Sequence, residues 1–347
     1  MNIPFFLNEM DNDSRIKKAF AMLDDHIDHE AFPPKFVKIM KDFAHQYIMI
    51  SAEHAECFDE ACARLKEYLH FVRENAVTPF AFEPYHEAIR APYDFYDFAV
   101  EMVFPLVDKE HSTIESEKRL NTIEEQLEKG ENVVLLANHQ SEADPQALAI
   151  LLRDKHPKLA QKLTFVAGDR VTSDPMAIPF SMGCNLLCIY SKRHIANPPE
   201  KKQHKLAHNQ KTMGVLRSLL SEGGAFIYVA PSGGRDRKNQ NGKVVVAPFD
   251  PGSIELFYLI SKKAGTKTHF YPLALSTYSF LPPPPVVEKE LGEERTINWC
   301  PIHARFLEEI DMENFPGSDI PIKERRRMAR AQHIHAIVEK AHETLIS

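Results

Sequence analysis

A histidine and an aspartate, His139 and Asp144, stand five residues apart just after an apolar run of the sequence. A carboxylate that accepts a hydrogen bond from one imidazole nitrogen leaves the other nitrogen able to take a proton, which is the arrangement of a general base. The same spacing also arises by chance, and an aspartate in such a place is often only a helix cap. The pair therefore indicates catalysis only if other parts of the chain supply a substrate site.

The stretch around this pair predicts a strand, a loop and a helix. Residues 132–137, NVVLLA, follow Gly130 and are short and rich in valine and leucine, which is typical of a buried strand. From Pro145 onward the apolar residues have helical spacing, and proline suits a first turn because its missing N–H would be unpaired there. We expect Asp144 to cap this helix and His139 to fold back onto it from the loop.

Two further polar clusters follow predicted strands. Residues 191–194, SKRH, come after the apolar run 186–190, and residues 231–238, PSGGRDRK, come after the run 225–230. Glycines let the backbone approach a ligand closely, and the planar fork of arginine suits an anion such as phosphate. Either cluster alone also fits a charged loop in solvent. Three clusters in the same kind of place indicate a base beside a cationic pocket.

The chain from residue 113 onward alternates between helix and strand patterns. Strands are expected at 132–137, 163–167, 186–190, 225–230 and 269–276. Helices are expected between them at 145–153, 201–221 and 253–263. This alternation predicts an α/β fold with a mostly parallel, mixed sheet flanked by helices. Ligands of such sheets collect at the carboxyl ends of the strands, where all three polar clusters are expected.

The N-terminal part of the chain has a different pattern. Residues 12–75 contain three stretches of helical apolar spacing, and Pro79, Pro84 and Pro92 interrupt the pattern after them. A length of 347 residues also favours two domains. We therefore predict a small N-terminal helical bundle over residues 1–85 and an α/β domain over residues 86–347.

The composition argues against several functional classes. A net charge of −7 and a pI near 6.2 disfavour a nucleic-acid-binding protein. Five cysteines without CxxC spacing predict free thiols in a reducing compartment. The first residues show no signal or transit pattern, and the longest uncharged stretch, 268–287, is broken by prolines. We expect no membrane-spanning segment, so contact with a lipid would be peripheral.

Other chemistries lack their motifs. The sequence contains no GxSxG elbow, no evident histidine partner for a cysteine, and no dinucleotide or P-loop fingerprint, so neither an acyl-enzyme nor a nucleotide cofactor is expected. His26 and His29 fit solvated helix positions better than a metal site, and none is predicted. The basic run 323–327 is most simply a solvated helix face, with a docking patch for an acidic partner as the alternative.

Four motifs in a fixed order point to one family. NHQSEADP (138–145), YSKRH (190–194), APSGGRDR (230–237) and APFDPGSIE (247–255) resemble the soluble glycerol-3-phosphate 1-acyltransferases of the plastid stroma and their chlamydial relatives, within the glycerolipid acyltransferase superfamily. The likeness runs from about residue 115 to about residue 285. It implies acyl transfer from acyl-[acyl-carrier protein] or acyl-CoA to the sn-1 hydroxyl of glycerol 3-phosphate, in phospholipid synthesis, without a cofactor.

The resemblance also implies a role for each site residue. His139 would be the general base and Asp144 its orienting partner. The glycerol phosphate would be bound by the residues Lys192, Arg193, His194, Ser232, Gly233, Arg235 and Arg237. Plant members carry lysine where this chain has Arg193, so the planar guanidinium group of arginine stands where those members have a single ammonium group. The missing transit pattern favours the cytoplasm of a bacterium, or a plastid protein in its mature form.

The implied reaction is a direct attack of the sn-1 hydroxyl on the thioester carbonyl, with His139 taking the proton. The apolar, irregular segment 175–187 is a candidate lining for the acyl chain, and ordinary core is the alternative. One rival is a sister acyltransferase that uses lysophosphatidate or dihydroxyacetone phosphate. Another is a non-catalytic module that binds an acyl carrier or a phospholipid.

Overall fold

The computed structural model describes residues 4–29, 32–192, 195–284 and 293–345. Its α-helices are α1 (Pro4–His29), α2 (Pro34–His54), α3 (Phe58–Val77), α4 (Phe95–Val103), α5 (Glu117–Glu128), α6 (Asp144–Leu152), α7 (Pro157–Lys162), α8 (Ile178–Met182), α9 (Lys202–Glu222), α10 (Pro251–Ala264) and α11 (Lys323–Leu345). Its strands are β1 (Tyr85–His86), β2 (Thr113–Glu115), β3 (Asn132–Ala137), β4 (Thr164–Gly168), β5 (Asn185–Ile189), β6 (Phe226–Val229), β7 (Arg237–Lys238), β8 (Val244–Val245), β9 (Thr268–Ser276) and β10 (His303–Phe306).

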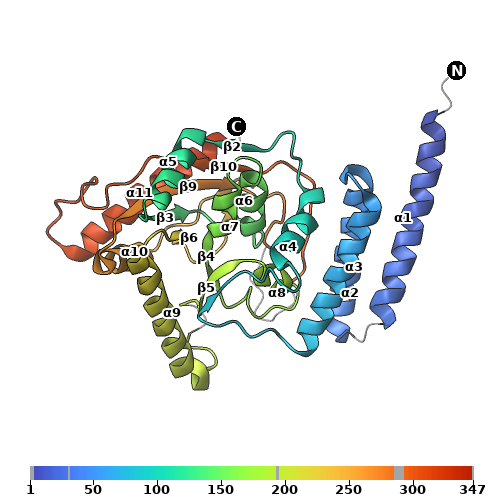
Figure 1. Ribbon diagram of the computed structural model, residues 1–347, viewed down its shortest axis with the longest axis horizontal. Helices are drawn as coiled ribbons and strands as arrows, with labels where there is room; N and C mark the ends of the chain where they lie inside the picture. Colours follow the sequence, from blue (N-terminus) through green and yellow to red (C-terminus); the bar gives the residue numbers. More distant parts are fainter. Residues whose placement is uncertain (1–3, 30–31, 193–194, 285–292, 346–347) are drawn as a thin grey trace.

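Eight of the described strands form one mixed sheet, in the order β1-β5-β4-β6-β3-β9-β10-β2. The strands from β5 to β9 in this order run parallel, whereas β1 is antiparallel to β5 and β10 is antiparallel to β9. Helices flank the sheet (Figure 1). The predicted α/β class with a mostly parallel, mixed sheet is therefore confirmed. The remaining described strands, β7 and β8, pair as a separate antiparallel ribbon.

Strand β3 lies in the middle of the sheet because it is apolar toward both faces. Val133 and Leu135 pack into one cluster with α5, α6 and α7, while Val134 and Leu136 pack into another with α9, α10 and α11. A strand covered on both faces has a continuous apolar sequence, which is why its position could be predicted. The chain leaves the sheet after Ala137 and turns into the loop that carries His139.

The predicted elements of the α/β part are present, with ends that differ by one or two residues. Two features of the structure differ from the sequence prediction. The segment 175–187, expected to be irregular, contains the short helix α8. The edge strands β1 and β2 and the strand β10 were not predicted, because each has only two to four residues and no apolar run of its own.

The N-terminal helices share an apolar core with the rest of the chain. In Figure 1, α1, α2 and α3 stand together at one side of the molecule, and α4 and α8 lie between them and the sheet. One apolar cluster runs from Leu23 and Leu65 in these helices to Phe98 in α4 and Ile150 in α6. The division into two domains at residue 85 stays a prediction.

Three smaller features have clear places in the fold. The basic run 323–327 begins α11, where Arg327 contacts Glu255 of α10 at 3.0 Å, so part of the run packs on a neighbouring helix. All five cysteines are free thiols. Among the helices of the described ranges, none has both the length and the apolar composition that crossing a bilayer requires.

Candidate active site

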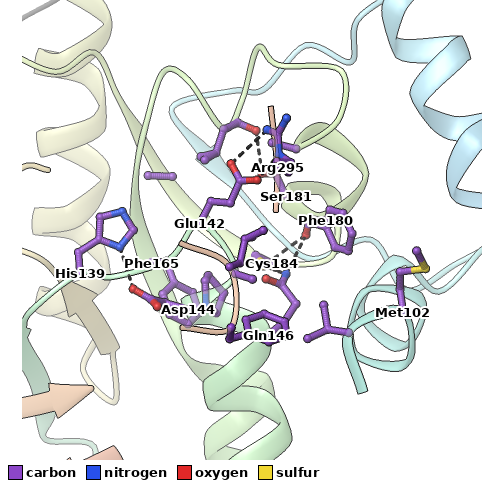
Figure 2. Close-up of a pocket in the computed structure, with 18 of the residues that line it drawn as sticks. Met102, His139, Glu142, Asp144, Gln146, Phe165, Phe180, Ser181, Cys184 and Arg295 are labelled. Atoms are coloured by element: carbon purple, nitrogen blue, oxygen red, sulfur yellow. Dashed lines mark hydrogen bonds and ion pairs between the residues drawn. The ribbon is translucent and has the colours of Figure 1, made fainter. Parts of the chain in front are cut away.

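The loop between β3 and α6 brings His139 against Asp144. The imidazole Nδ1 lies 2.8 Å from the Oδ2 atom of Asp144 (Figure 2). The side chain of Asp144 is 1% exposed, whereas that of His139 is 30% exposed. Because a carboxylate offers only acceptors, we assign the imidazole proton to Nδ1. Among the described residues, the other nitrogen, Nε2, has no hydrogen-bond partner, so its lone pair faces outward from the pair.

The carboxylate of Asp144 is held by three further donors. Its Oδ2 atom accepts the backbone N–H of Gln140 at 3.0 Å, and its Oδ1 atom accepts the backbone N–H of Ser141 at 3.1 Å and the hydroxyl of Thr277 at 2.5 Å. The sequence predicted Asp144 as the helix cap, and this was wrong. Ala143 is the capping residue, and Asp144, in the first turn of α6, bonds back to the loop instead.

A buried polar network fixes this loop to its neighbours. The side-chain oxygen of Gln140 accepts the backbone N–H groups of Thr277 and Tyr278 at 2.8 and 3.0 Å, and its amide group donates to Asp236 at 3.1 Å. Asn138 donates to the same carboxylate of Asp236 at 2.9 Å. Burial raises the pKa of Asp236, although the hydrogen bonds that its carboxylate accepts act to lower it. Since each partner is satisfied, the loops after β3, β6 and β9 are held as one rigid unit.

Residues 231–238, the glycine-rich cluster after β6, lie directly beside His139. The backbone N–H of Asp236 donates to the carbonyl oxygen of His139 at 2.6 Å. Gly233 has a φ of +62°, a conformation that favours glycine, and a Cβ built on it would meet only open space. The hydroxyl of Ser232 donates to the carbonyl of Gly234 at 2.8 Å. The structure thus brings this predicted cluster beside His139.

The cationic residues of the predicted phosphate site already contact other groups. The guanidinium of Arg235 contacts Glu293. Arg237 starts strand β7 and pairs with Val245 of β8. Lys192 extends its ammonium group to Asp250, the capping residue of α10, at 2.7 Å. Two further predicted members, Arg193 and His194, lie outside the described residues.

His139 and Asp144 stand at the wall of an apolar cavity (Figure 2). The segment 175–187, predicted as a candidate lining, contributes Ala177, Phe180, Ser181, Cys184 and Leu186 to this wall. The N-terminal helices contribute Phe43, Tyr47 and Tyr68. Among the described residues, none of the predicted phosphate ligands lines the cavity, so His139 stands between an apolar space and the polar loop after β6.

One arginine of the cavity wall was missed by sequence reasoning. Arg295 contacts Glu142 through its Nε and Nη2 atoms and Asp174 through Nη2 at 3.3 Å. Burial opposes the charge of Arg295, but the two carboxylates outweigh it and raise its pKa further. These partners lie 153 and 121 positions away in the sequence, so no local pattern indicates them.

The arrangement suits base catalysis rather than a covalent thiol intermediate. The lone pair of His139 Nε2 can accept a proton from a hydroxyl group, and Asp144 stabilises the imidazolium ion that results. The one cysteine that faces the cavity among the described residues is Cys184. Burial raises the pKa of Cys184 to about 12, so its thiol stays protonated near neutral pH.

Comparisons with known proteins relate this chain to acyltransferases. The acyltransferase family model matches residues 119–276, a range that includes His139, Asp144 and the glycine-rich cluster 231–238. The chain is 37% identical over 270 residues to a chloroplastic glycerol-3-phosphate acyltransferase of Arabidopsis thaliana, covering 78% of this chain and 59% of that protein. The enzyme of the same name from Spinacia oleracea is 38% identical over 282 residues, covering 80% and 60%.

A relative from Cucurbita moschata, also named a chloroplastic glycerol-3-phosphate acyltransferase, is 42% identical over 236 residues, covering 68% of this chain and 53% of that protein. The crystal structure of a 1-acyl-sn-glycerophosphate (LPA) acyltransferase, PlsC, from Thermotoga maritima has a TM-score of 0.39 at 15% identity, covering 89% of this chain and 94% of that chain. The chain spans about 60% of the length of the first two relatives. Residues 119–276 thus match the acyltransferase family model, and most of the chain is similar to chloroplastic glycerol-3-phosphate acyltransferases.

Proposed function

We propose that this chain transfers a fatty acyl group from acyl-[acyl-carrier protein] or acyl-CoA to the sn-1 hydroxyl of glycerol 3-phosphate. The observation that carries the proposal is the 2.8 Å bond between His139 and Asp144 at the wall of an apolar cavity. Homology to enzymes named for this reaction supports the choice of substrates. The product would be 1-acyl-sn-glycerol 3-phosphate, an early intermediate of phospholipid synthesis.

The proposed reaction is a direct transfer. Nε2 of His139 takes the proton of the sn-1 hydroxyl, and the oxygen attacks the thioester carbonyl carbon to form the new C–O bond. As the tetrahedral intermediate collapses, the C–S bond breaks and the imidazolium returns its proton to the thiolate. A well-placed base of this kind contributes roughly 10²–10⁴ to the rate, and Asp144 keeps the imidazole in the required tautomer.

The two sides of the base suggest where each substrate binds. The apolar cavity offers its surface to the acyl chain, and Tyr47 and Tyr68 extend that surface onto the N-terminal helices. The glycine-rich loop 231–237, bonded to the backbone of His139, would receive the phosphate through Ser232, Gly233, Arg235 and Arg237. Lys192, Arg193 and His194 are proposed as further ligands from the neighbouring loop.

The relatives are named as chloroplastic, and this favours a plastid rather than a bacterial cytoplasm for the chain. A helical bundle over residues 1–85 that helps to enclose the acyl chain, attached to an α/β domain over residues 86–347, is the domain arrangement that we propose. The partners of the chain would then be glycerol 3-phosphate and an acyl thioester.

The decisive test is an acyl-transfer assay on the purified chain with labelled glycerol 3-phosphate and a panel of acyl thioesters. The variant His139→Ala should lose turnover by a factor of roughly 10²–10⁴ while it still binds glycerol 3-phosphate. His111, whose Nδ1 lies 2.8 Å from Asp108, forms a similar pair, and its side chain is 67% exposed, so His111→Ala is a matched control that should keep full activity.

Competing acceptors separate the rival functions. Preferred acylation of lysophosphatidate or dihydroxyacetone phosphate would replace glycerol 3-phosphate as the substrate. Binding of acyl thioesters without turnover, unchanged in His139→Ala, would favour a non-catalytic binding module. Turnover that survives this substitution would refute the role of His139.

A further inference from the structure

The guanidinium group of Arg235 forms an ion pair with a carboxylate of the protein itself, that of Glu293. The Nη2 atom of Arg235 lies 2.6 Å from Oε1 and 3.0 Å from Oε2 of Glu293. The two side chains are only 16% and 7% exposed. A second guanidinium, that of Arg170, approaches Oε2 of Glu293 to 4.0 Å. Glu293 thus presents two anionic oxygens at the place where an external anion would meet Arg235.

The position of Glu293 is fixed by its neighbours in the sequence. Arg295, two residues further on, donates from Nη1 to the carbonyl oxygen of Glu293 at 3.0 Å. Arg295 is itself held at the cavity wall by Glu142 and Asp174. The carboxylate therefore stands on an anchored backbone, unlike the long, mobile side chains of an ordinary surface ion pair.

This ion pair is adjacent to the base. The residue after Arg235 donates its backbone N–H to the carbonyl oxygen of His139. An acceptor whose hydroxyl reaches His139 can therefore place a phosphate group a few bonds away within reach of the same loop. A phosphate that binds Nη2 of Arg235 must take the place of Glu293, because both contacts of Glu293 are made to that atom.

We propose that Glu293 is an internal counter-ion of Arg235 that the phosphate of the acceptor displaces, and that it thereby sets acceptor affinity and selects for phosphate esters. A phosphate monoester carries up to two charges and three strong acceptor oxygens, whereas Glu293 offers one charge and two oxygens. The exchange favours a phosphate dianion and disfavours a neutral polyol. This inference rests on the proposed function, because that function makes Arg235 a phosphate ligand.

The test measures binding of glycerol 3-phosphate, and separately of inorganic phosphate, to the full chain by isothermal titration calorimetry. Glu293→Gln keeps the shape of the side chain and removes the competing charge, so the Kd of both anions should fall about tenfold, which corresponds to about 1.4 kcal/mol. Glu293→Asp keeps the charge but withdraws it by one methylene group, and should give a smaller gain.

A matched control removes the charge of another carboxylate–arginine ion pair, far from the proposed phosphate site in the sequence. Glu115 of β2 contacts Arg305 of β10 through both carboxylate oxygens, with one contact at 2.9 Å. Glu115→Gln changes the net charge by the same amount and should leave the Kd unchanged. In an Arg235→Ala background, Glu293→Gln should give no gain. Circular dichroism of each variant shows whether it is folded.

The outcomes separate the inference from the proposed function. Unchanged or weaker anion binding in both folded Glu293 variants overturns the counter-ion, as does an equal gain in Glu115→Gln. If glycerol 3-phosphate is acylated but Glu293→Gln leaves its binding unaltered, only the counter-ion fails. If no acyl transfer occurs but Glu293→Gln tightens phosphate binding, the counter-ion stands and the proposed function fails.

Discussion

Replacing Asp144 with asparagine keeps the size of the side chain, removes its charge and tests its proposed role as the orienting acid. Both oxygens of Asp144 face donors: Oδ2 meets Nδ1 of His139 and the N–H of Gln140, and Oδ1 meets the N–H of Ser141 and the hydroxyl of Thr277. An amide has only one oxygen, so its NH2 group must face one of these pairs of donors.

Each orientation of the amide has a different cost. If the NH2 group faces His139, Nδ1 must become the acceptor and the proton moves to Nε2, so the base is lost. If it faces Ser141 and Thr277, the threonine hydroxyl can rotate, but the N–H of Ser141 is left unpaired, and the neutral amide oxygen beside His139 no longer stabilises the imidazolium ion that forms during catalysis. Either way one buried backbone N–H loses its partner, which costs about 1–3 kcal/mol of folding stability.

The kinetic effect should be a fall in kcat of roughly 10²–10⁴, the contribution of a general base, with little change in the KM for glycerol 3-phosphate. Steady-state assays give both constants, and ¹⁵N NMR of the His139 ring reports which nitrogen carries the proton. Asp108→Asn, which alters the exposed pair with His111, should leave both constants unchanged. A fall in kcat below tenfold, or an effect confined to KM, would refute the reasoning.

Three further predictions follow from other contacts. Arg295→Met leaves two carboxylates at the cavity wall without their cation, so urea unfolding should show a loss of about 3–5 kcal/mol; a loss below 1 kcal/mol would contradict it. Burial lowers the pKa of His342, so stability that is present above about pH 6.5 should fall as the pH drops below it, and His342→Gln should flatten this dependence in pH-dependent unfolding. Ala177→Leu narrows the apolar cavity and should lower kcat/KM several-fold for long acyl chains relative to short ones; an unchanged ratio would remove this wall from the acyl site.

The sign of the pH effect follows from proton binding. His342 lies 2.8 Å from the amide group of Gln140 and is largely buried, and burial disfavours its protonated form. The unfolded chain therefore binds a proton at a higher pH than the folded chain does. Acid stabilises the unfolded state relative to the folded one, and the hydrogen bond to Gln140 links this loss to the loop of the base.

Local chemistry decided which parts of the fold could be predicted. Strand β3 and helix α6 have apolar patterns of their own, and His139 lies close to Asp144 in the sequence, so a short loop is enough to join them. The support of this pair comes from far away. Thr277 is 133 positions from Asp144, and Asp236 is 96 positions from Gln140. Such partners meet only because the parallel sheet places the ends of β3, β6 and β9 together.

The charged residues of the predicted phosphate site show the same limit. Sequence reasoning counted Arg235 as a cation available to a ligand, but its own carboxylate partner, Glu293, is 58 positions away. Lys192 likewise meets Asp250 across the same distance of 58 positions. A cluster of positive residues in a sequence gives the sign of the field that a substrate meets. It does not reveal how much of that charge the protein has already neutralised.

The hydrogen bonds around His139 and the ion pair between Arg235 and Glu293 should affect different kinetic constants. His139 is held by buried hydrogen bonds that do not involve the residues of the proposed phosphate site, so we expect damage to Asp144, Gln140 or Asp236 to appear in kcat. The Nη2 atom of Arg235 contacts a carboxylate that, on our proposal, the acceptor displaces, so changes at Glu293 should appear in the acceptor KM and leave kcat nearly constant. A variant of Glu293 that lowered kcat and KM together would instead mean that this carboxylate also helps to orient His139. The Arg235–Glu293 pair and the hydrogen bonds around His139 would then act as one network.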